Sequence, residues 1–107
     1  MIFLDLLGGE ANMVKVVAKN FIHKNKISEL INLLKELKDY AIKEKKCVKY
    51  ELFQDNDNKT IITVISEWEK ISHLDDYYKS KYFIKNAERI MDLICKESEV
   101  NIYNVLE

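Results

Sequence analysis

Asn20 is the one amide in an alternating set of otherwise apolar residues near the start of the chain. It shares a face with Val14, Val16 and Ala18 in a run of period two. A buried amide costs free energy unless its donors and its acceptor find hydrogen-bond partners. Asn20 is therefore either a structural amide satisfied near the end of a strand, or a donor aimed at the carbonyl oxygen of a bound ligand.

Aromatic residues form a second group with chemical potential. Trp68 is the only tryptophan of the chain, and it offers a large flat surface with one donor, the indole N–H. Tyr77, Tyr78, Tyr82 and Phe83 follow it closely. Each phenol needs a partner, and a tyrosine-rich wall with few polar groups suits a flat aromatic ligand. The pattern predicts a pocket for such a ligand, although Trp68 by itself is also typical of a core residue and the tyrosines could cluster by chance.

Two histidines, His23 and His73, are the only imidazoles. His23 follows the first alternating run beside lysines, which is typical of an exposed loop residue. His73 lies a few residues after Trp68 in a predicted short helix. It is either a surface residue of that helix or a group that reaches the predicted pocket, and we include it among the candidate pocket residues.

The sequence holds no motif for a metal or a cofactor. Cys47 and Cys95 form no Cys-x-x-Cys pair, and no histidine lies at ligand spacing from either. Both are expected to be free, partly buried packing residues. There is also no Gly-rich phosphate loop and no nucleophile-base pair. We therefore expect neither a metal nor a cofactor.

Charge is nearly balanced along the chain. Lys and Arg total 17 against 18 for Asp and Glu, and Arg89 is the only arginine. No positive excess exists to meet phosphates, which argues against nucleic-acid and anionic-membrane partners. The sequence also lacks a cleavable signal peptide and a long apolar span, so a cytoplasmic location is expected.

The first residues differ from the rest. Residues 1–7 are mostly apolar but too few to cross a membrane, and the only two glycines, Gly8 and Gly9, follow them. Codons for Gly8, Gly9 and Glu10 can form a ribosome-binding sequence just ahead of Met13. Our hypothesis is that residues 1–12 are an N-terminal extension, a translated leader, and that one domain spans residues 13–107.

Hydrophobic periodicity predicts seven elements in this domain. Alternation of period two marks strands, and apolar stripes at three-and-four spacing mark helices. Asn25 and Ser80 are expected N-caps for the first and third helices, and 54–59 is a predicted turn. The expected elements are strand 14–22, helix 26–44, strand 47–53, strand 60–68, helix 71–79, helix 81–96 with Phe83, Ala87, Ile90 and Ile94 on its buried stripe, and strand 99–106.

The order of elements predicts an α+β fold of the ferredoxin-like βαββαβ type, with an antiparallel sheet and helices on one face. Such a sheet should bury one face and leave the other polar. The strand at 60–68 is nevertheless apolar on both faces, with Ile61 and Ile65 on one and Ile62 and Val64 on the other. We therefore expect the second face to meet another subunit, in a homodimer that closes its two sheets into a barrel.

From about Met13 to Leu106 the ordered motifs resemble the antibiotic biosynthesis monooxygenase (ABM) family. The matching pieces are VVAKN, KNK at the first helix start, YELFQD, ISEWEK, LDDYYKSKYF and EVNIYNVL. The resemblance implies a dimeric α/β barrel with a pocket between sheet and helices in each subunit. Characterised members oxidise quinols or polyketide anthrones with molecular oxygen and without metal, flavin or other cofactor, while others degrade heme.

The resemblance extends to single positions. Asn20 stands where the oxygenases and heme degraders of the family place a strand Asn, and Trp68 matches the E-x-W motif. Tyr77 stands where many members have His and the heme degraders a pocket Trp, and Tyr82 where others have His before Phe. Ala87 replaces the iron-binding His of the heme degraders, which argues against heme catalysis.

These observations predict a cofactor-independent monooxygenase of a small phenolic or quinol-like aromatic compound, with molecular oxygen as co-substrate. Asn20 would polarise a substrate oxygen, Trp68 and Tyr77 would position the ring, and Tyr82 or His73 would carry a proton. Tyr78 and Phe83 would line the pocket. Two alternatives use the same fold: a non-catalytic small-ligand-binding or stress-response dimer, and a heme-binding or heme-degrading protein.

Overall fold

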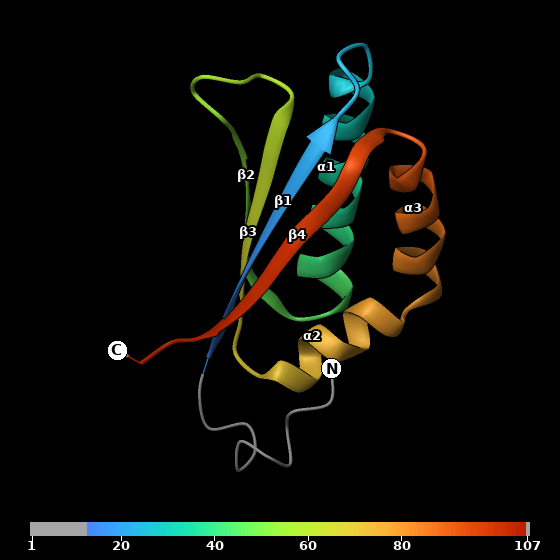
Figure 1. Ribbon diagram of the computed structural model, residues 1–107. Helices are drawn as coiled ribbons and strands as arrows, with labels where there is room; N and C mark the ends of the chain where they lie inside the picture. The colour runs from blue at the N-terminus through green and yellow to red at the C-terminus, as the bar shows by residue number, and fades with distance from the viewer. Residues whose placement is uncertain (1–12, 107) are drawn as a thin grey trace.

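The computed structural model describes residues 13–106, so the hypothesis of a translated leader at residues 1–12 lies outside the described residues. Seven elements follow one another in the predicted order (Figure 1). They are β1 (Val14–Ile22), α1 (Ile27–Glu44), β2 (Cys47–Gln54), β3 (Ile61–Trp68), α2 (Ile71–Lys79), α3 (Lys81–Met91) and β4 (Ile94–Asn104).

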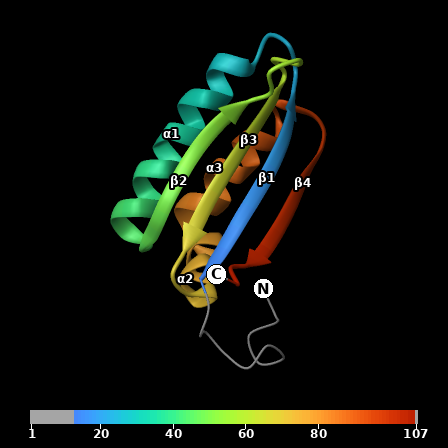
Figure 2. The same cartoon turned by 90° about the vertical axis from the view of Figure 1, so that its left-hand side faces the viewer.

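The four strands form one antiparallel sheet in the order β2-β3-β1-β4. The three helices of residues 13–106 all lie on the same side of this sheet, and none of them covers its other face (Figures 1 and 2). The predicted α+β ferredoxin-like fold with helices on one face is therefore confirmed. None of the helices in residues 13–106 is both long and apolar enough to cross a membrane.

The core lies between the sheet and the helices. Because side chains alternate along a strand, Val14 and Val16 of β1 and Ile62 and Val64 of β3 all point to the helix side and are buried. The buried stripe of α1 packs with them in one cluster and consists of Leu30, Leu33, Leu34, Leu37 and Ala41. This packing fixes which face of the sheet receives Asn20 and Trp68.

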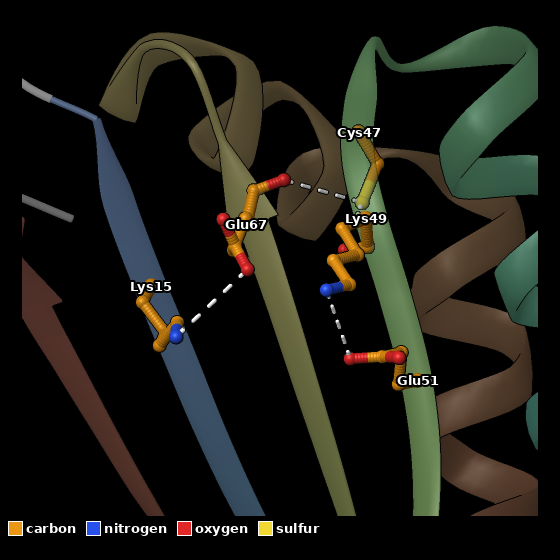
Figure 3. Close-up of polar contacts among 5 residues, drawn as sticks. All are labelled: Lys15, Cys47, Lys49, Glu51 and Glu67. Atoms are coloured by element: carbon orange, nitrogen blue, oxygen red, sulfur yellow. Dashed lines mark hydrogen bonds and ion pairs between the residues drawn. The ribbon is translucent and has the colours of Figure 1, made fainter.

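The opposite, open face of the sheet mixes apolar and charged residues. Val17, Ile61 and Ile65 lie there, only partly buried. Figure 3 shows two ion pairs on this face: Lys15 Nζ lies 3.8 Å from Glu67, and Lys49 Nζ lies 3.6 Å from Glu51. These pairs are exposed to solvent and so contribute little to stability in the isolated chain.

α2 and α3 meet at Ser80, which confirms the predicted N-cap. Its backbone is extended, and its hydroxyl accepts a hydrogen bond of 3.2 Å from the backbone N–H of Phe83. The same hydroxyl donates a bond of 2.6 Å to the carbonyl of Tyr77 at the end of α2. Ser80 thus joins the end of one helix to the start of the next, and fixes the angle between them.

The N-cap of α1 and the junction between α3 and β4 were predicted wrongly. The N-cap of α1 is Lys26, with no side-chain cap bond, instead of Asn25. α3 ends at Met91 and β4 begins at Ile94, whereas helix was predicted to Lys96 and strand from Glu99. The chain leaves the helix early because Leu93 is buried and its carbonyl accepts a hydrogen bond from the N–H of His23, at the end of β1.

The predicted buried stripe of α3 was also partly wrong. Phe83, Ala87 and Ile90 are only half-buried, and Ile94 pairs with Ile22 in the sheet instead of lying on the helix. The buried residue of α3 is Asn86, whose amide donates to the carbonyl of Tyr82 and whose oxygen accepts from Arg89. A polar residue can occupy this position because both ends of its amide are satisfied.

Candidate functional site

Asn20 lies on the helix side of β1, and its amide is engaged within the sheet. Nδ2 donates to the carbonyl of Ile62 at 3.2 Å and, less closely, to that of Ala18 at 3.4 Å. Oδ1 accepts a hydrogen bond of 2.8 Å from the hydroxyl of Ser98 on β4. Asn20 therefore ties three strands together, and the long bond to Ala18 is its weakest interaction.

Trp68 ends β3 on the same side of the sheet and is completely enclosed, with 0% of its surface exposed. Its indole N–H donates to the hydroxyl of Ser66 at 3.0 Å. The ring of Tyr77 on α2 packs against it, with 5.2 Å between the centroids. Trp68 therefore supports the packing of α2 against the end of β3.

The aromatic group predicted from the sequence comes together around Tyr77. Its ring centroid lies 5.6 Å from that of Tyr78 and 4.8 Å from that of Phe83, which are themselves 5.0 Å apart. Burial, together with the neighbouring phenols of Tyr50 and Tyr78, raises the pKa of Tyr77 far above that of a free tyrosine. Burial also raises the pKa of Tyr78 to about 12. Both phenols are thus neutral at physiological pH and cannot act as bases there.

Tyr82, the fourth candidate aromatic residue, belongs to the surface. Its ring stacks on Tyr40 of α1 at a centroid distance of 4.5 Å, and Tyr40 in turn lies 6.2 Å from Tyr77. Tyr40 and Tyr82 line a surface hollow of about 250 Å³ between α1 and α3. Charged residues of α1 complete the lining, namely Glu36, Asp39, Lys43 and Glu44.

His73 lies in the first turn of α2 and is half-buried. Its Nδ1 atom is buried and has no hydrogen-bond partner within the described part of the chain. A buried ring nitrogen without a partner is costly, so this atom is the least satisfied polar group of α2. His23, by contrast, is exposed in the loop after β1, as expected.

Asn20 and the aromatic group lie on the same face of the sheet, but at opposite ends of the strands. In the register of β1 and β3, Val14 lies opposite Trp68, whereas Asn20 lies opposite Ile62, six positions further along both strands. At the usual rise of a strand this separates Asn20 from Trp68 by about 20 Å. A ligand that touched both would have to lie along the sheet.

Sequence reasoning did not select three residues on the helix side of β4, the first of which contacts Asn20. Ser98 is its hydrogen-bond partner, and Val100 and Ile102 continue the same face of β4 opposite Ala18 and Val16. Val100 and Ile102 are 51% and 38% exposed, whereas on β1 Val16 is buried and Ala18 is partly buried. We call Ala18, Val100 and Ile102 the β4 strip. The alternation of Ser98, Val100 and Ile102 against Glu99 and Asn101 was the signal that could have revealed it.

Cys47 is unsuited to catalysis as a thiolate. Both cysteines are free, as expected, but only Cys47 is buried; Cys95 is exposed, so the prediction of a partly buried packing residue was wrong for it. The thiol of Cys47 donates to the carbonyls of Lys49 at 3.1 Å and Glu67 at 3.6 Å, the latter drawn in Figure 3. Burial raises the pKa of Cys47 to about 11, so it remains a thiol at neutral pH. Among residues 13–106, no three His, Cys, Asp or Glu side chains gather as metal ligands.

Relatives of known structure share the whole arrangement. A conserved protein from Methanosarcina mazei is 33% identical, with a TM-score of 0.82, and the match covers 87% of this chain and 92% of that one. A structure described as an antibiotic biosynthesis monooxygenase is 24% identical, with a TM-score of 0.80, and the match covers 88% and 99% of the two chains. The second likeness speaks for the fold alone.

One curated relative matches by sequence. An uncharacterized protein of Synechocystis is 27% identical over 93 residues, which are 86% of this chain but 63% of the relative. The chain thus spans less than two thirds of that protein. Residues 13–89, well over half of the chain, match the sequence pattern of the family described as antibiotic biosynthesis monooxygenase. The segment includes Asn20, Trp68 and the whole aromatic group, and the chain belongs to the antibiotic biosynthesis monooxygenase family.

Proposed function

We propose that the protein is a cofactor-independent monooxygenase that oxidises a small phenolic or quinol-like aromatic compound with molecular oxygen. The observation that carries this proposal is the polar pair Asn20 and Ser98 at the end of the exposed, apolar β4 strip. A flat apolar surface with a few polar groups at one end suits an aromatic ring that carries an oxygen substituent. Membership of the family supports the same reaction class.

Asn20 would bind the substrate oxygen. The 3.4 Å contact from Nδ2 to the carbonyl of Ala18 is longer than a typical N–H···O bond, so its replacement by a substrate oxygen costs little. The bonds to Ile62 and Ser98 would remain and hold the amide in place. A donor fixed in this way favours the ionised form of the substrate, because it faces the charge that develops on oxygen.

The reaction needs no external reductant. The ionised substrate gives one electron to dioxygen, and the superoxide formed combines with the substrate radical in a new C–O bond. Uptake of a proton and loss of water from the resulting hydroperoxide leave a carbonyl group. One oxygen atom enters the product, the other leaves as water, and all electrons come from the substrate.

The aromatic candidates would serve this reaction in different ways. Trp68 and Tyr77 are enclosed, so we propose that they position α2 over the sheet instead of reacting. Tyr78 and Phe83, which pack around Tyr77, would line the aromatic end of the site. Tyr82, which is 37% exposed, and the half-buried His73 would be the candidates for proton transfer.

Oxygen uptake tests the proposal. Purified protein is incubated with a panel of hydroquinones and anthrones while dissolved oxygen and product are measured. We expect uptake with at least one compound, and Asn20→Ala should lower kcat by about a hundredfold, the usual effect of removing one such donor. Asn32→Ala, at an exposed position on α1, is the matched control.

A second variant guards against misfolding. Because Val100 is an exposed residue of the β4 strip, Val100→Arg should leave the thermal unfolding temperature nearly unchanged while it blocks substrate binding. Full activity of this variant, or no oxygen uptake by the wild-type protein with any compound, would contradict the proposal.

A non-catalytic ligand-binding protein, including one used in a stress response, is the second candidate. It is favoured by the internal hydrogen bonds of Asn20 and Trp68, which leave the described site without an obviously free catalytic group. Such a protein would be stabilised by its ligand in proportion to the logarithm of ligand concentration, without consuming oxygen. Thermal shifts measured on the same panel separate the two functions.

We also propose that the protein is a homodimer joined through the open face of the sheet. Proteins of this family are typically dimeric, and Val17, Ile61 and Ile65 supply apolar surface on that face. Analytical ultracentrifugation should find a dimer that Ile65→Glu converts to monomer. Ile42→Glu, an exposed position on α1, should leave it intact.

A further inference from the structure

Four aromatic side chains form a continuous series from the core to the surface. Trp68 is fully enclosed, Tyr77 is 3% exposed, Tyr40 is half-buried and Tyr82 is 37% exposed. Successive ring centroids lie 5.2, 6.2 and 4.5 Å apart. The series passes from β3 through α2 and α1 to α3, and so crosses the helical layer seen in Figure 1.

We propose that Trp68, Tyr77, Tyr40 and Tyr82 are an electron-transfer path that carries an oxidising equivalent from the buried indole to the protein surface. Trp and Tyr are the aromatic side chains that lose one electron most readily. Electronic coupling falls steeply with distance, so three short steps between rings in contact are much faster than one long step. Phe83, which also contacts Tyr77, is too hard to oxidise to serve as a carrier.

The surroundings give the path a direction. An oxidised tyrosine must lose its phenolic proton to become a stable neutral radical. Tyr82 can release that proton to water, whereas Tyr77 is enclosed, and burial raises its pKa. The hollow beside Tyr40 and Tyr82 also carries three carboxylates and one ammonium, from Glu36, Asp39, Glu44 and Lys43. Negative charge there stabilises a positive charge on the outer pair of rings and offers proton acceptors.

The step balances as follows in electrons and protons. An oxygen-centred radical takes one electron from the indole of Trp68 and is reduced. One electron then moves from Tyr82 through Tyr40 and Tyr77 to the oxidised indole, and the phenol of Tyr82 loses its proton to water. A thiol in solution returns one hydrogen atom to the Tyr82 radical. Only the natural source of the oxygen-centred radical rests on the proposed oxygenase function; the transfer itself does not.

Flash photolysis tests the transfer without any substrate. Trp68 is the only tryptophan, so a pulse at the red edge of the indole absorption, where tyrosine does not absorb, ejects an electron from this residue alone. With an added electron scavenger, the indole radical band should decay while the tyrosyl radical band grows at the same rate. Electron paramagnetic resonance after freezing should then show a tyrosyl radical at Tyr82.

Tyr→Phe variants locate the path, because they keep each ring and remove its readily oxidised phenol. Tyr40→Phe and Tyr77→Phe should each prolong the indole radical several-fold. Tyr82→Phe should abolish the exposed radical and its quenching by a thiol. Tyr103→Phe is the control, since Tyr103 is exposed on the open face of the sheet, opposite Lys15. Near-ultraviolet circular dichroism and thermal unfolding confirm that each variant is folded.

Equal indole radical lifetimes in wild type, Tyr40→Phe and Tyr77→Phe would overturn the proposal, as would a radical that never reaches Tyr82. Oxygen uptake on the hydroquinone panel is measured on the same variants. If the oxidising equivalent moves from Trp68 to Tyr82 but no oxygen is consumed, the oxygenase function is contradicted and the electron-transfer path is supported. If oxygen is consumed but no electron transfer to the indole is seen, the electron-transfer path is contradicted and the oxygenase function is supported.

Discussion

The hydroxyl of Ser98 donates a hydrogen bond of 2.8 Å to the amide oxygen of Asn20, across 78 positions of sequence. This bond links β4 to β1 at the point where the pairing of the two strands shifts in register, between Lys19 and Phe21. It thus stabilises the edge strand and orients the amide that we propose binds substrate.

Ser98→Ala should therefore affect both stability and function. Loss of the bond leaves the oxygen of Asn20 without this partner in a buried place, which costs about 1–3 kcal/mol of unfolding free energy. Urea denaturation measures the change. Ser28→Ala, an exposed position on α1, should alter the midpoint little; an equal change in both variants would show that the bond contributes nothing.

Alkaline pH should unfold the protein more readily because of its buried tyrosines. Burial raises the pKa of Tyr50, Tyr77 and Tyr78 in the folded state, while the unfolded chain releases these protons near pH 10. Stability contributed by the neutral phenols is complete below that pH. It falls as pH rises further, across the window to the folded pKa of about 12 for Tyr78.

Tyr78→Phe should flatten this decline when unfolding free energy is measured between neutral and alkaline pH. The control is Tyr82→Phe, at an exposed tyrosine on α3, away from the open face of the sheet. If both variants lose stability along the wild-type curve, the buried phenol is not the cause.

Ser80 should behave as a cap with two bonds. Ser80→Ala removes the acceptor for the N–H of Phe83 and the donor to the carbonyl of Tyr77, and should cost about 1–2 kcal/mol. Ser80→Thr keeps a hydroxyl and should restore most of the loss. Thermal unfolding of the two variants decides; a Thr variant no better than Ala would point to crowding instead of hydrogen bonding.

Lys46 lies in the tight connection between α1 and β2 with φ of 62°, in the left-handed region. A residue with a Cβ atom is strained there, while glycine is not. Lys46→Gly should therefore raise the unfolding free energy by up to about 1 kcal/mol, and Lys46→Val should lower it. Glycine at neighbouring Lys45, whose φ is −124°, should instead destabilise the protein.

The sequence predicted those parts of the fold that depend on local patterns. Period-two alternation located Val14–Ile22, and the apolar stripe at three-and-four spacing located Ile27–Glu44 apart from its first residue. The end of α3 was missed because it depends on a distant contact, the bond between the carbonyl of Leu93 and the N–H of His23. Periodicity continues through this point and carries no sign of it.

In the candidate site, too, the sequence predicted what depends on local patterns and missed what depends on contacts distant in sequence. Trp68 and Tyr77 were expected together, and a short connection does bring α2 back over the end of β3. The distance between Asn20 and Trp68 depends on the register of β1 against β3, which alternation does not determine. Ser98 was missed for the same reason, since nothing local marks a partner 78 positions away.

β4 is bonded to the described sheet along one side only, through β1, and the strip on its helix side stays uncovered. Its amides should consequently exchange with deuterated solvent well before those of the two central strands, β1 and β3. Strand opening would part Ser98 from Asn20 and widen the approach to the strip. The rate at which β4 opens, measured as hydrogen–deuterium exchange by mass spectrometry, would then limit how fast a compound binds to the strip and leaves it.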